Sequence, residues 1–447
     1  MALRKDFIWG TATSACQIEG ASNIDGKGLS NWELYPLIDN VCYQNQNPND
    51  GGHHYTHMED DVRLLAELGV KAYRFSFAWT RILPEGLGKI NPKGLEFYDR
   101  LLDELEKYGI EPYGTIFHWD YPYELVKKGG WLNDESPLWF LEYTKILVDR
   151  YKNRIKNWIP LNEPSNVLEV GGHSLKASLI HSTKEKLQML HNILLAHGHA
   201  AQYIKANGGR VGTALCSLAF APYDENCKED IEAAKKALFD VEKDDIWRLS
   251  IWSDPMILGK YPDKYYELYC EFERPYITKK DMRIISTPLD FLGYNLYSGT
   301  PVKSDGKGGY VIMNHPIGNP KTNMDSDVYP KIMYWVAKFI YERYPMPFYF
   351  MENGCAITDI VSEDKKVHDG PRIEFIKQHI KQVKRACADG IDIRAYFIWS
   401  FLDNFEWFNG YSKRFGIVYI DYQTKERIKK DSFEFYKEII KQNGNNL

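Results

Sequence analysis

The sequence predicts a single α/β domain, a (β/α)8 barrel that spans residues 1–447. Eight short apolar segments alternate, for the most part, with longer amphipathic segments of helical period. Repeated strand-then-helix order predicts a parallel sheet with crossover helices. Eight such units favour a closed barrel over an open doubly wound sheet. A dinucleotide-binding fold is disfavoured, because no Gly-x-Gly-x-x-Gly motif follows the first strand.

The predicted strands are apolar runs of strand length, most of them bounded by turn residues or charged residues. They comprise residues 7–10, 71–79, 110–117, 156–161, 210–218, 290–295, 345–351 and 393–400. A hairpin is predicted at 417–426. No linker, low-complexity tract or internal repeat suggests a second domain.

The predicted helices carry apolar residues at helical spacing, as Leu95, Tyr98, Leu101 and Leu105 do in one of them. Glycines such as Gly109 end several of these segments. The helices are expected at residues 59–68, 94–108, 137–151, 184–207, 231–250, 262–272, 331–343, 372–388 and 432–441.

Composition excludes several classes of function. The net charge of −5 provides no basic surface for nucleic acid. No apolar stretch reaches the ~18 residues that a membrane span needs, and no signal segment opens the chain. The 7 cysteines include no CxxC pair, which fits a reducing compartment better than a disulfide framework. We therefore expect a cytoplasmic protein that binds neither nucleic acid nor membrane.

Polar side chains lie at the trailing ends of the predicted strands or in the loops that follow. They are Gln17, His118, Asn162, Glu163, Asn295, Tyr297, Glu352 and Glu406. In a (β/α)8 barrel these ends meet at one face, where active sites are built. Glu163 would come from the fourth strand and Glu352 from the seventh, so barrel closure would bring the two carboxylates together.

Two facing carboxylates without an obvious metal cluster suggest acid/base and nucleophilic chemistry. Retaining glycoside hydrolysis needs one carboxylic acid to protonate the leaving oxygen and one carboxylate to attack the anomeric carbon. Arg74, within the second strand, would keep one glutamate ionised through its charge. The hydroxyl of Tyr297 would hold the same carboxylate in line.

Two other groups of residues resemble reactive sites. His53, His54 and His57 with nearby acids resemble a metal cluster, but spacing alone does not show convergent geometry. A helix N-terminal segment with acidic residues near the positive end of the dipole is the favoured interpretation. Cys355, beside Glu352, is expected to be an inert small side chain rather than a reactive thiol.

Along nearly its whole length the sequence resembles family 1 glycoside hydrolases, the β-glucosidase family. The motifs that carry the resemblance are residues 7–14 with Gln17-Ile18-Glu19-Gly20, Tyr73-Arg74-Phe75-Ser76 with Ala78-Trp79, His118-Trp119-Asp120, Asn162-Glu163-Pro164, Glu352-Asn353-Gly354, Trp399-Ser400, and residues 403–407 and 410–416. Each short motif is weak alone, but their order along the predicted strands is specific.

The resemblance implies a retaining β-glucosidase with Glu163 as general acid/base and Glu352 as nucleophile. Retention places the two carboxyl groups about 5–5.5 Å apart. The sugar-binding residues that it implies are Gln17, His118, Trp119, Asn162, Asn295, Tyr297, Trp399, Glu406 and Trp407. Arg74 and Phe415 would support them. No cofactor and no metal are implied, and the partner would be a small β-glucoside or oligosaccharide.

The chain departs from the family pattern on the leaving-group side. Ser165 and Ser326 stand where tryptophans that flank the leaving group are usual. Elsewhere, Cys16 stands where the family usually has a tyrosine. Residues 172–175 replace the usual His-Ala-Pro-Gly segment. These differences predict a wider or more polar aglycone site.

Other readings of the same residues remain open. A 6-phospho-β-glucosidase of the same family usually lacks the pair Glu406-Trp407, which this chain has, whereas Lys413 occurs in both kinds. A catalytically silent sugar-binding barrel would not need both glutamates. A transglycosylase would share the covalent intermediate and differ in excluding water.

Overall fold

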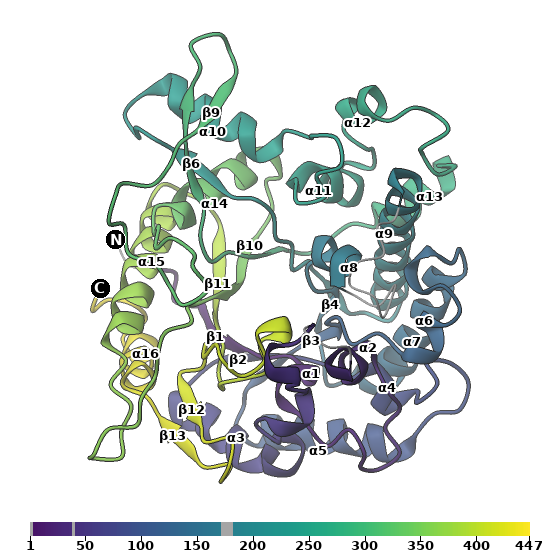
Figure 1. The fold of residues 1–447 in the computed structure, drawn as a ribbon, viewed down its shortest axis with the longest axis vertical. Helices are drawn as coiled ribbons and strands as arrows, with labels where there is room; N and C mark the ends of the chain where they lie inside the picture. The colour runs from purple at the N-terminus through teal and green to yellow at the C-terminus, as the bar shows by residue number, and fades with distance from the viewer. Residues whose placement is uncertain (1–2, 38–40, 171–181) are drawn as a thin grey trace.

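The computed structural model describes residues 3–37, 41–170 and 182–447, and its centre is a parallel β-barrel (Figure 1). The barrel strands are β1 (Ile8–Ala12), β2 (Ala72–Ser76), β3 (Glu111–Phe117), β4 (Asn157–Leu161), β5 (Arg210–Val211), β7 (Leu292–Asn295), β10 (Phe348–Asn353) and β11 (Ile393–Trp399). They form an 8-stranded sheet in the order β5-β4-β3-β2-β1-β11-β10-β7, in which every neighbouring pair is parallel.

The sheet closes between its two end strands, β5 and β7. Parallel bridges join Gly212 to Phe291 and Leu215 to Tyr294. The N–H of Leu215 donates to the carbonyl of Gly293 at 2.9 Å, and the N–H of Asn295 donates back to the carbonyl of Leu215 at 2.7 Å. The predicted (β/α)8 barrel is therefore confirmed, although the regular ladder of β5 is shorter than the strand predicted at 210–218.

The outer layer consists of helices that surround the barrel (Figure 1). The long ones are α3 (His54–Leu68), α5 (Pro92–Lys107), α7 (Ser136–Tyr151), α9 (Thr183–Ala206), α14 (Ile332–Arg343), α15 (Gly370–Ala388) and α16 (Asp431–Lys441). In α5 the residues that predicted the helix, Leu95, Tyr98, Leu101 and Leu105, are all buried. Helical periodicity thus located these helices well, because it reports the buried stripe directly.

Short helices and turns connect these layers. They are α1 (Ala15–Ile18), α2 (Asn31–Leu34), α4 (Trp79–Ile82), α6 (Tyr123–Val126) and α8 (Pro164–Val170), with the 3₁₀ turns η1 (Tyr35–Leu37), η2 (Tyr43–Asn45), η3 (Pro48–Asp50), η4 (Gly130–Leu132) and η5 (Trp407–Asn409). Among them α8 matters most for the site, because it starts immediately after Glu163.

The excursion between β5 and β7 was predicted least well. It holds β6 (Phe220–Pro222), α10 (Lys228–Phe239), α11 (Leu249–Leu258), α12 (Asp263–Leu268) and α13 (Lys279–Ile285), and these elements lie in the upper part of Figure 1. β6 pairs with β8 (Thr300–Ser304), which pairs with β9 (Tyr310–Ile312), in a small sheet that was not predicted.

The helix predicted at 231–250 is wrong, because α10 ends at Phe239. Two aspartates after that point bind backbone N–H groups with their side chains. Asp240 accepts from Val241 at 3.0 Å and Asp245 accepts from Trp247 at 3.0 Å. Such local bonds compete with helical ones and favour turns.

The C-terminal hairpin lies slightly later than predicted. Its strands are β12 (Val418–Ile420) and β13 (Arg427–Lys429), so the second strand lies beyond the predicted end at residue 426. The carboxylate of Asp421 accepts from the backbone N–H groups of Gln423 and Thr424, at 2.8 and 3.0 Å. This Asx-type turn lengthens the connection.

The interior of the barrel is filled by side chains from all of its strands or the residues next to them. These include Ala12, Ala72, Tyr113, Ile159, Ala214, Phe291, Tyr349, Met351, Ala395, Phe397 and Trp399. The rings of Phe291 and Tyr349 stack with their centroids 4.5 Å apart, and those of Tyr113 and Phe397 meet edge-on at 5.1 Å. This packed interior leaves the open ends of the strands as the place for a site.

The contact between β5 and β7, which closes the barrel, leaves no room for a side chain at Gly293. A Cβ at Gly293 would lie 2.0 Å from the carbonyl oxygen of Thr213 and 2.5 Å from the side chain of Met351. We therefore expect Gly293→Ala to force β5 and β7 apart and to destabilise the protein by about 1–3 kcal/mol, as overpacking does. Urea unfolding measures this.

Gly370→Ala is the matched control, since a Cβ there meets nothing within 4 Å. Its stability should stay within about 0.5 kcal/mol of the parent. Equal stability of the two variants would contradict the role assigned to Gly293.

Candidate active site

Glu163 and Glu352 line one cavity of about 310 Å³ at the trailing ends of the strands. Glu163 follows β4, and its backbone is held in the left-handed region, with φ 43°. Pro164, which begins α8, disfavours the helical conformation for the residue before it. Glu352 lies within β10 and is 3% exposed. The topology thus brings together two carboxyl groups that are far apart in the sequence.

Glu352 is held by a cation and a hydroxyl. Arg74 Nη1 donates to Oε1 at 2.5 Å, and the hydroxyl of Tyr297 donates to Oε2 at 2.5 Å. Burial raises the pKa of Glu352, and the charge of Arg74 and the bond from Tyr297 oppose that rise. These donors favour the ionised form of Glu352, which is the form that a nucleophile needs.

Glu163 has only neutral donors. Asn295 Nδ2 donates to Oε1 at 2.7 Å, and Asn166 Nδ2 donates to Oε2. Burial and the charge of Glu352 raise the pKa of Glu163 to about 7, against the effect of the two amides and of Arg74. The two carboxyl groups therefore have different environments, and the difference places the proton on Glu163.

One fully buried arginine connects the elements around the site. Besides Glu352, Arg74 donates to Thr115 Oγ1 at 3.1 Å, to the carbonyl of Met351 at 3.3 Å and to Asn162 Oδ1 at 2.6 Å. Asn162 in turn accepts from Asn295 Nδ2 at 3.0 Å. The network fixes the strand ends that carry the two glutamates.

An aromatic wall faces the carboxyl pair. The ring of His118 stacks against those of Trp399 and Trp407, with centroids 5.7 and 5.9 Å away. Burial, with the charge of Arg74, lowers the pKa of His118 well below its usual range, so the ring is neutral. Its Nε2 lies 3.1 Å from Asn162 Nδ2, and Trp119 Nε1 donates to the carbonyl of Asn162 at 3.0 Å.

Glu406 is the third carboxyl group of the cavity. Burial, then the charges of Glu352 and Glu163, raise the pKa of Glu406 to about 8. Its Oε2 is a buried atom that has no partner among the described residues, and the same holds for Nδ1 of His118 and Oδ1 of Asn295. Buried polar atoms are rarely left unsatisfied, and the two of these that belong to lining residues, on Glu406 and His118, are therefore available to the polar groups of a ligand.

Most of the residues predicted for the site line this cavity. They are His118, Trp119, Asn162, Glu163, Tyr297, Ser326, Glu352, Trp399, Glu406, Trp407 and Phe415. Arg74 and Asn295 lie behind the lining and act through the two glutamates. Gln17 is fully buried and does not line the cavity. Its amide nitrogen is already bonded to protein, since Nε2 donates to Asn404 Oδ1 at 3.1 Å and to the carbonyl of Phe405 at 2.9 Å.

Ser165 is a correction to the predicted aglycone side. It is fully buried, does not line the cavity, and its Oγ lies 3.2 Å from Cys216 Sγ. The following residue, Asn166, faces the cavity instead, because α8 turns between the two positions. Residues 172–175, which were also assigned to this side, lie outside the described residues.

The sequence analysis did not predict several of the residues that line the cavity. They are Asn166, Cys216, Ser217, Trp247, Thr322, Met324, Gly354 and Cys355. Asn166 carried a usable signal, since it lies one helical turn after Glu163. Trp247 carried none, because it falls in the part of the excursion where a helix was wrongly predicted. Burial raises the pKa of the Cys355 thiol to about 12, so this thiol is neutral.

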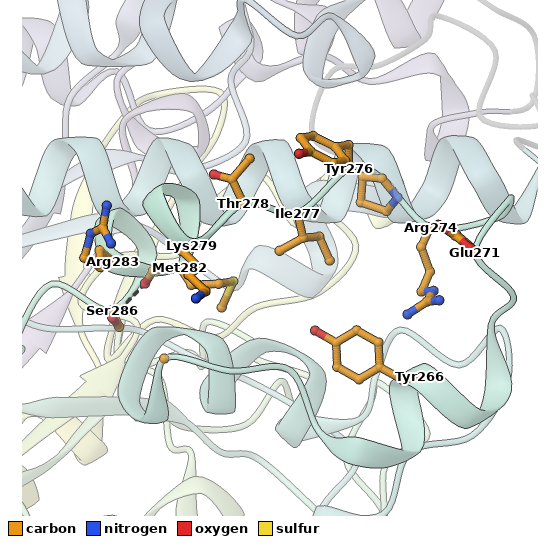
Figure 2. A pocket seen from close by; sticks show the side chains of 12 residues that line it. Tyr266, Glu271, Arg274, Tyr276, Ile277, Thr278, Lys279, Met282, Arg283 and Ser286 are labelled. Atoms are coloured by element: carbon orange, nitrogen blue, oxygen red, sulfur yellow. Dashed lines mark hydrogen bonds between the residues drawn. The ribbon is translucent and has the colours of Figure 1, made fainter.

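A larger open cavity of about 760 Å³ shares no residue with this one (Figure 2). Its lining includes Tyr266, Arg274, Tyr276 and Arg283, and the guanidinium of Arg274 lies 5.0 Å from the ring of Tyr266. Among the described residues, Glu271 is the one carboxylate in its lining. Without a second acid it does not provide paired acid/base chemistry.

The histidine segment beginning at His53 forms the start of α3. His54 Nδ1 lies 2.8 Å from Asp61, and His53 Nε2 lies 2.7 Å from the carbonyl of Asn49. Across residues 3–37, 41–170 and 182–447, no group of three His, Cys, Asp or Glu side chains is arranged to hold a metal ion. Within the same ranges, no helix has both the length and the apolarity to cross a membrane.

Comparison with known proteins agrees with this architecture. The model of glycosyl hydrolase family 1 matches residues 1–445. Beta-glucosidase A of Thermotoga maritima is 40% identical over 445 residues, which are 98% of this chain and 97% of that protein. Beta-glucosidase A of Acetivibrio thermocellus is 38% identical over 452 residues, 98% of each chain. A solved structure of a Thermotoga maritima beta-glucosidase with deoxynojirimycin superposes with a TM-score of 0.89 at 39% identity, covering 99% of both chains.

The fold and the paired carboxyl groups define a barrel enzyme of the glycoside hydrolase class. The chain belongs to glycosyl hydrolase family 1. The resemblance inferred from the sequence motifs is thereby confirmed, and so is the (β/α)8 fold class that it implied.

Glu406 provides a test of the electrostatics. Its carboxyl keeps a proton up to about pH 8 in the folded protein but loses it near pH 4.5 when unfolded. Between these values the folded state binds more protons, so stability falls as the pH rises, by about 1.4 kcal/mol per pH unit. We expect Glu406→Gln to be more stable than the parent, by a margin that grows from pH 5 to pH 8 and then levels off.

Urea unfolding at several pH values measures this margin. Glu363→Gln, which changes an exposed carboxylate, is the control and should show a margin near zero throughout. A margin for Glu406→Gln that does not change with pH would rule out the assignment.

Proposed function

We propose that this protein hydrolyses terminal β-D-glucosides with retention of configuration, through a covalent glycosyl-enzyme. One observation carries the proposal: Glu163 and Glu352 share a cavity but have unequal partners, amides for one and a guanidinium with a phenol for the other. Family membership supports it, as does the similarity to two proteins that are named beta-glucosidase A.

In the first step the carboxylate of Glu352 attacks the anomeric carbon while Glu163 gives its proton to the glycosidic oxygen. The bond from the anomeric carbon to that oxygen breaks, and the aglycone leaves as an alcohol. Arg74 and Tyr297 hold Glu352 in its ionised form and orient its two oxygens. Glu163 now carries the negative charge that Glu352 has lost.

In the second step the ionised Glu163 takes a proton from water, and the water oxygen attacks the anomeric carbon. The ester bond to Glu352 breaks, and both carboxyl groups return to their starting states. Because burial and Glu352 raise the pKa of Glu163 to about 7, this group exchanges a proton readily near neutral pH.

The glucose ring would be held by the aromatic wall and by the unpaired polar atoms. Trp399 supplies the platform, and Trp407 and Trp119 extend it. Glu406 and His118 present buried atoms without protein partners, Oε2 and Nδ1, to hydroxyl groups. Asn162 and Tyr297 also line the cavity and complete the contacts. A small β-glucoside or oligosaccharide is thus the expected substrate.

A phosphorylated sugar is a poor match. The residues that line the cavity include three glutamates and, among the described residues, no lysine or arginine. A phosphate needs cations or backbone N–H groups. Site electrostatics therefore favour the unphosphorylated glucoside. We also place the enzyme in the cytoplasm, since its 7 cysteines, all in described positions, are free thiols.

The roles of the two glutamates are separable with azide. In Glu352→Gly, kcat on 2,4-dinitrophenyl β-D-glucoside should fall by several orders of magnitude, and azide should restore turnover as the α-glucosyl azide, because it attacks in a single displacement. In Glu163→Ala, azide should instead attack the glycosyl-enzyme and yield the β-glucosyl azide. Product NMR distinguishes these outcomes, and the same anomer from both variants would overturn the assignment.

Phosphate discrimination is testable with one pair of substrates. Cellobiose should be hydrolysed, whereas kcat/KM for cellobiose 6′-phosphate, phosphorylated on the non-reducing glucose, should be lower by at least about a hundredfold, since an uncompensated charge would enter a low-dielectric cavity. Glucose release measures the first reaction and glucose 6-phosphate release the second. A preference for the phosphorylated disaccharide would select the 6-phospho-β-glucosidase alternative.

A further inference from the structure

Asn166 makes a contact to the acid/base candidate that nothing in the general reaction requires. It lies in the first turn of α8, three residues after Glu163, and its Nδ2 donates to Glu163 Oε2. Asn295 Nδ2 donates to the other oxygen at 2.7 Å. Both oxygens of Glu163 therefore accept hydrogen bonds, which is the arrangement of a carboxylate and not of a carboxylic acid.

The protonated state of Glu163 requires a change in this arrangement. A carboxylic acid presents one O–H, and an amide N–H cannot accept from it. Asn295 is tied to the buried network through Asn162 Oδ1 at 3.0 Å. Asn166 borders the open cavity, and among the described residues its Nδ2 otherwise meets only a weak acceptor, Cys216 Sγ at 3.7 Å. The bond from Asn166 is thus the one that gives way when Glu163 takes a proton.

The free energy of this contact depends on the charge of Glu163. A hydrogen bond to an ionised group is roughly twice as strong as a neutral one. If the amide turned to accept from the protonated acid through Oδ1, the neutral bond would be the weaker of the two. Asn166 therefore favours the ionised form in either geometry.

We propose that Asn166 is a positioning residue that stabilises the ionised form of Glu163, the form present in the glycosyl-enzyme, and releases it for the acid step. This inference rests on the proposed function of Glu163 as acid/base. Asn166 then opposes burial and Glu352, which raise the pKa of Glu163. Other groups that act on Glu163, or are acted on by it, are Arg74, Cys216, Tyr294, Tyr297, Glu352 and Glu406.

The pH dependence of activity tests the proposal. With cellobiose, the basic limb of kcat/KM reports the acid step, which needs protonated Glu163. Removing the donor in Asn166→Ala should move this limb up by about one pH unit. Asn166→Asp keeps the side-chain shape but adds a like charge, so it should move the limb at least as far.

A second substrate reports the other step. The leaving group of 2,4-dinitrophenyl β-D-glucoside needs no proton, so kcat reflects attack of water assisted by ionised Glu163. Its acidic limb should also move up in both variants. A purely structural defect would lower the height of these profiles without moving their limbs.

Ser165→Ala is the matched control on the same helical turn, since Ser165 contacts Cys216 and does not line the cavity. Its limbs should coincide with those of the parent. The unfolding midpoint shows which of the variants Asn166→Asp and Asn166→Ala fold like the parent. If the limbs of the pH profiles do not move in such a variant, the proposed role of Asn166 is wrong. Failure of the underlying function is a different result, namely unchanged cellobiose hydrolysis in Glu163→Ala.

Discussion

The buried ion pair between Arg74 and Glu352 is the constraint on which the rest of the site depends. A charge this deep is stable only with partners, and Arg74 has acceptors on β3, on β10 and after β4. The same contacts that neutralise the guanidinium therefore fix the register of the strand ends around it. Catalytic geometry and barrel stability are in this way properties of one network. Glu163, outside this ion pair, is free to hold a titrating proton.

Much of this was predictable because barrel folding repeats a simple pattern. Apolar runs located the barrel strands, and the stripe of Leu95, Tyr98 and Leu101 located α5, since burial is written directly into residue spacing. Strand ends that carry polar residues pointed to Glu163 and Glu352 for the same reason. Closure of the barrel then brings Glu163 and Glu352 together, although no sequence motif encodes their proximity. The family motifs added the roles of individual residues.

The failures occurred where side chains bind locally or where helical phase decides orientation. Asp240 and Asp245 bind backbone N–H groups and interrupt a segment whose composition favours a helix. Ser165 was assigned to the cavity by its position after Pro164, but a helix turns about 100° per residue, so its neighbour Asn166 faces the cavity instead. Neither the end of the helix before Asp240 nor the orientation of Ser165 and Asn166 on α8 can be seen without the three-dimensional structure.

The cluster of acids beside a neutral histidine has a further consequence. Burial raises the pKa of Glu163 to about 7 and that of Glu406 to about 8, so before substrate binds the negative charge of the cavity is centred on Glu352, whose partner Arg74 lies behind the lining. Glycoside cleavage passes through an oxocarbenium-like state, in which the sugar ring gains positive charge. The charge of Glu352 is present before the substrate arrives, and Glu163 becomes ionised as it gives up its proton, so both favour that state over the neutral ground state. The cavity thus binds positive charge better than neutral groups. The positive charge that it stabilises most is that of the oxocarbenium-like transition state, which exists only while the glycosidic bond is breaking.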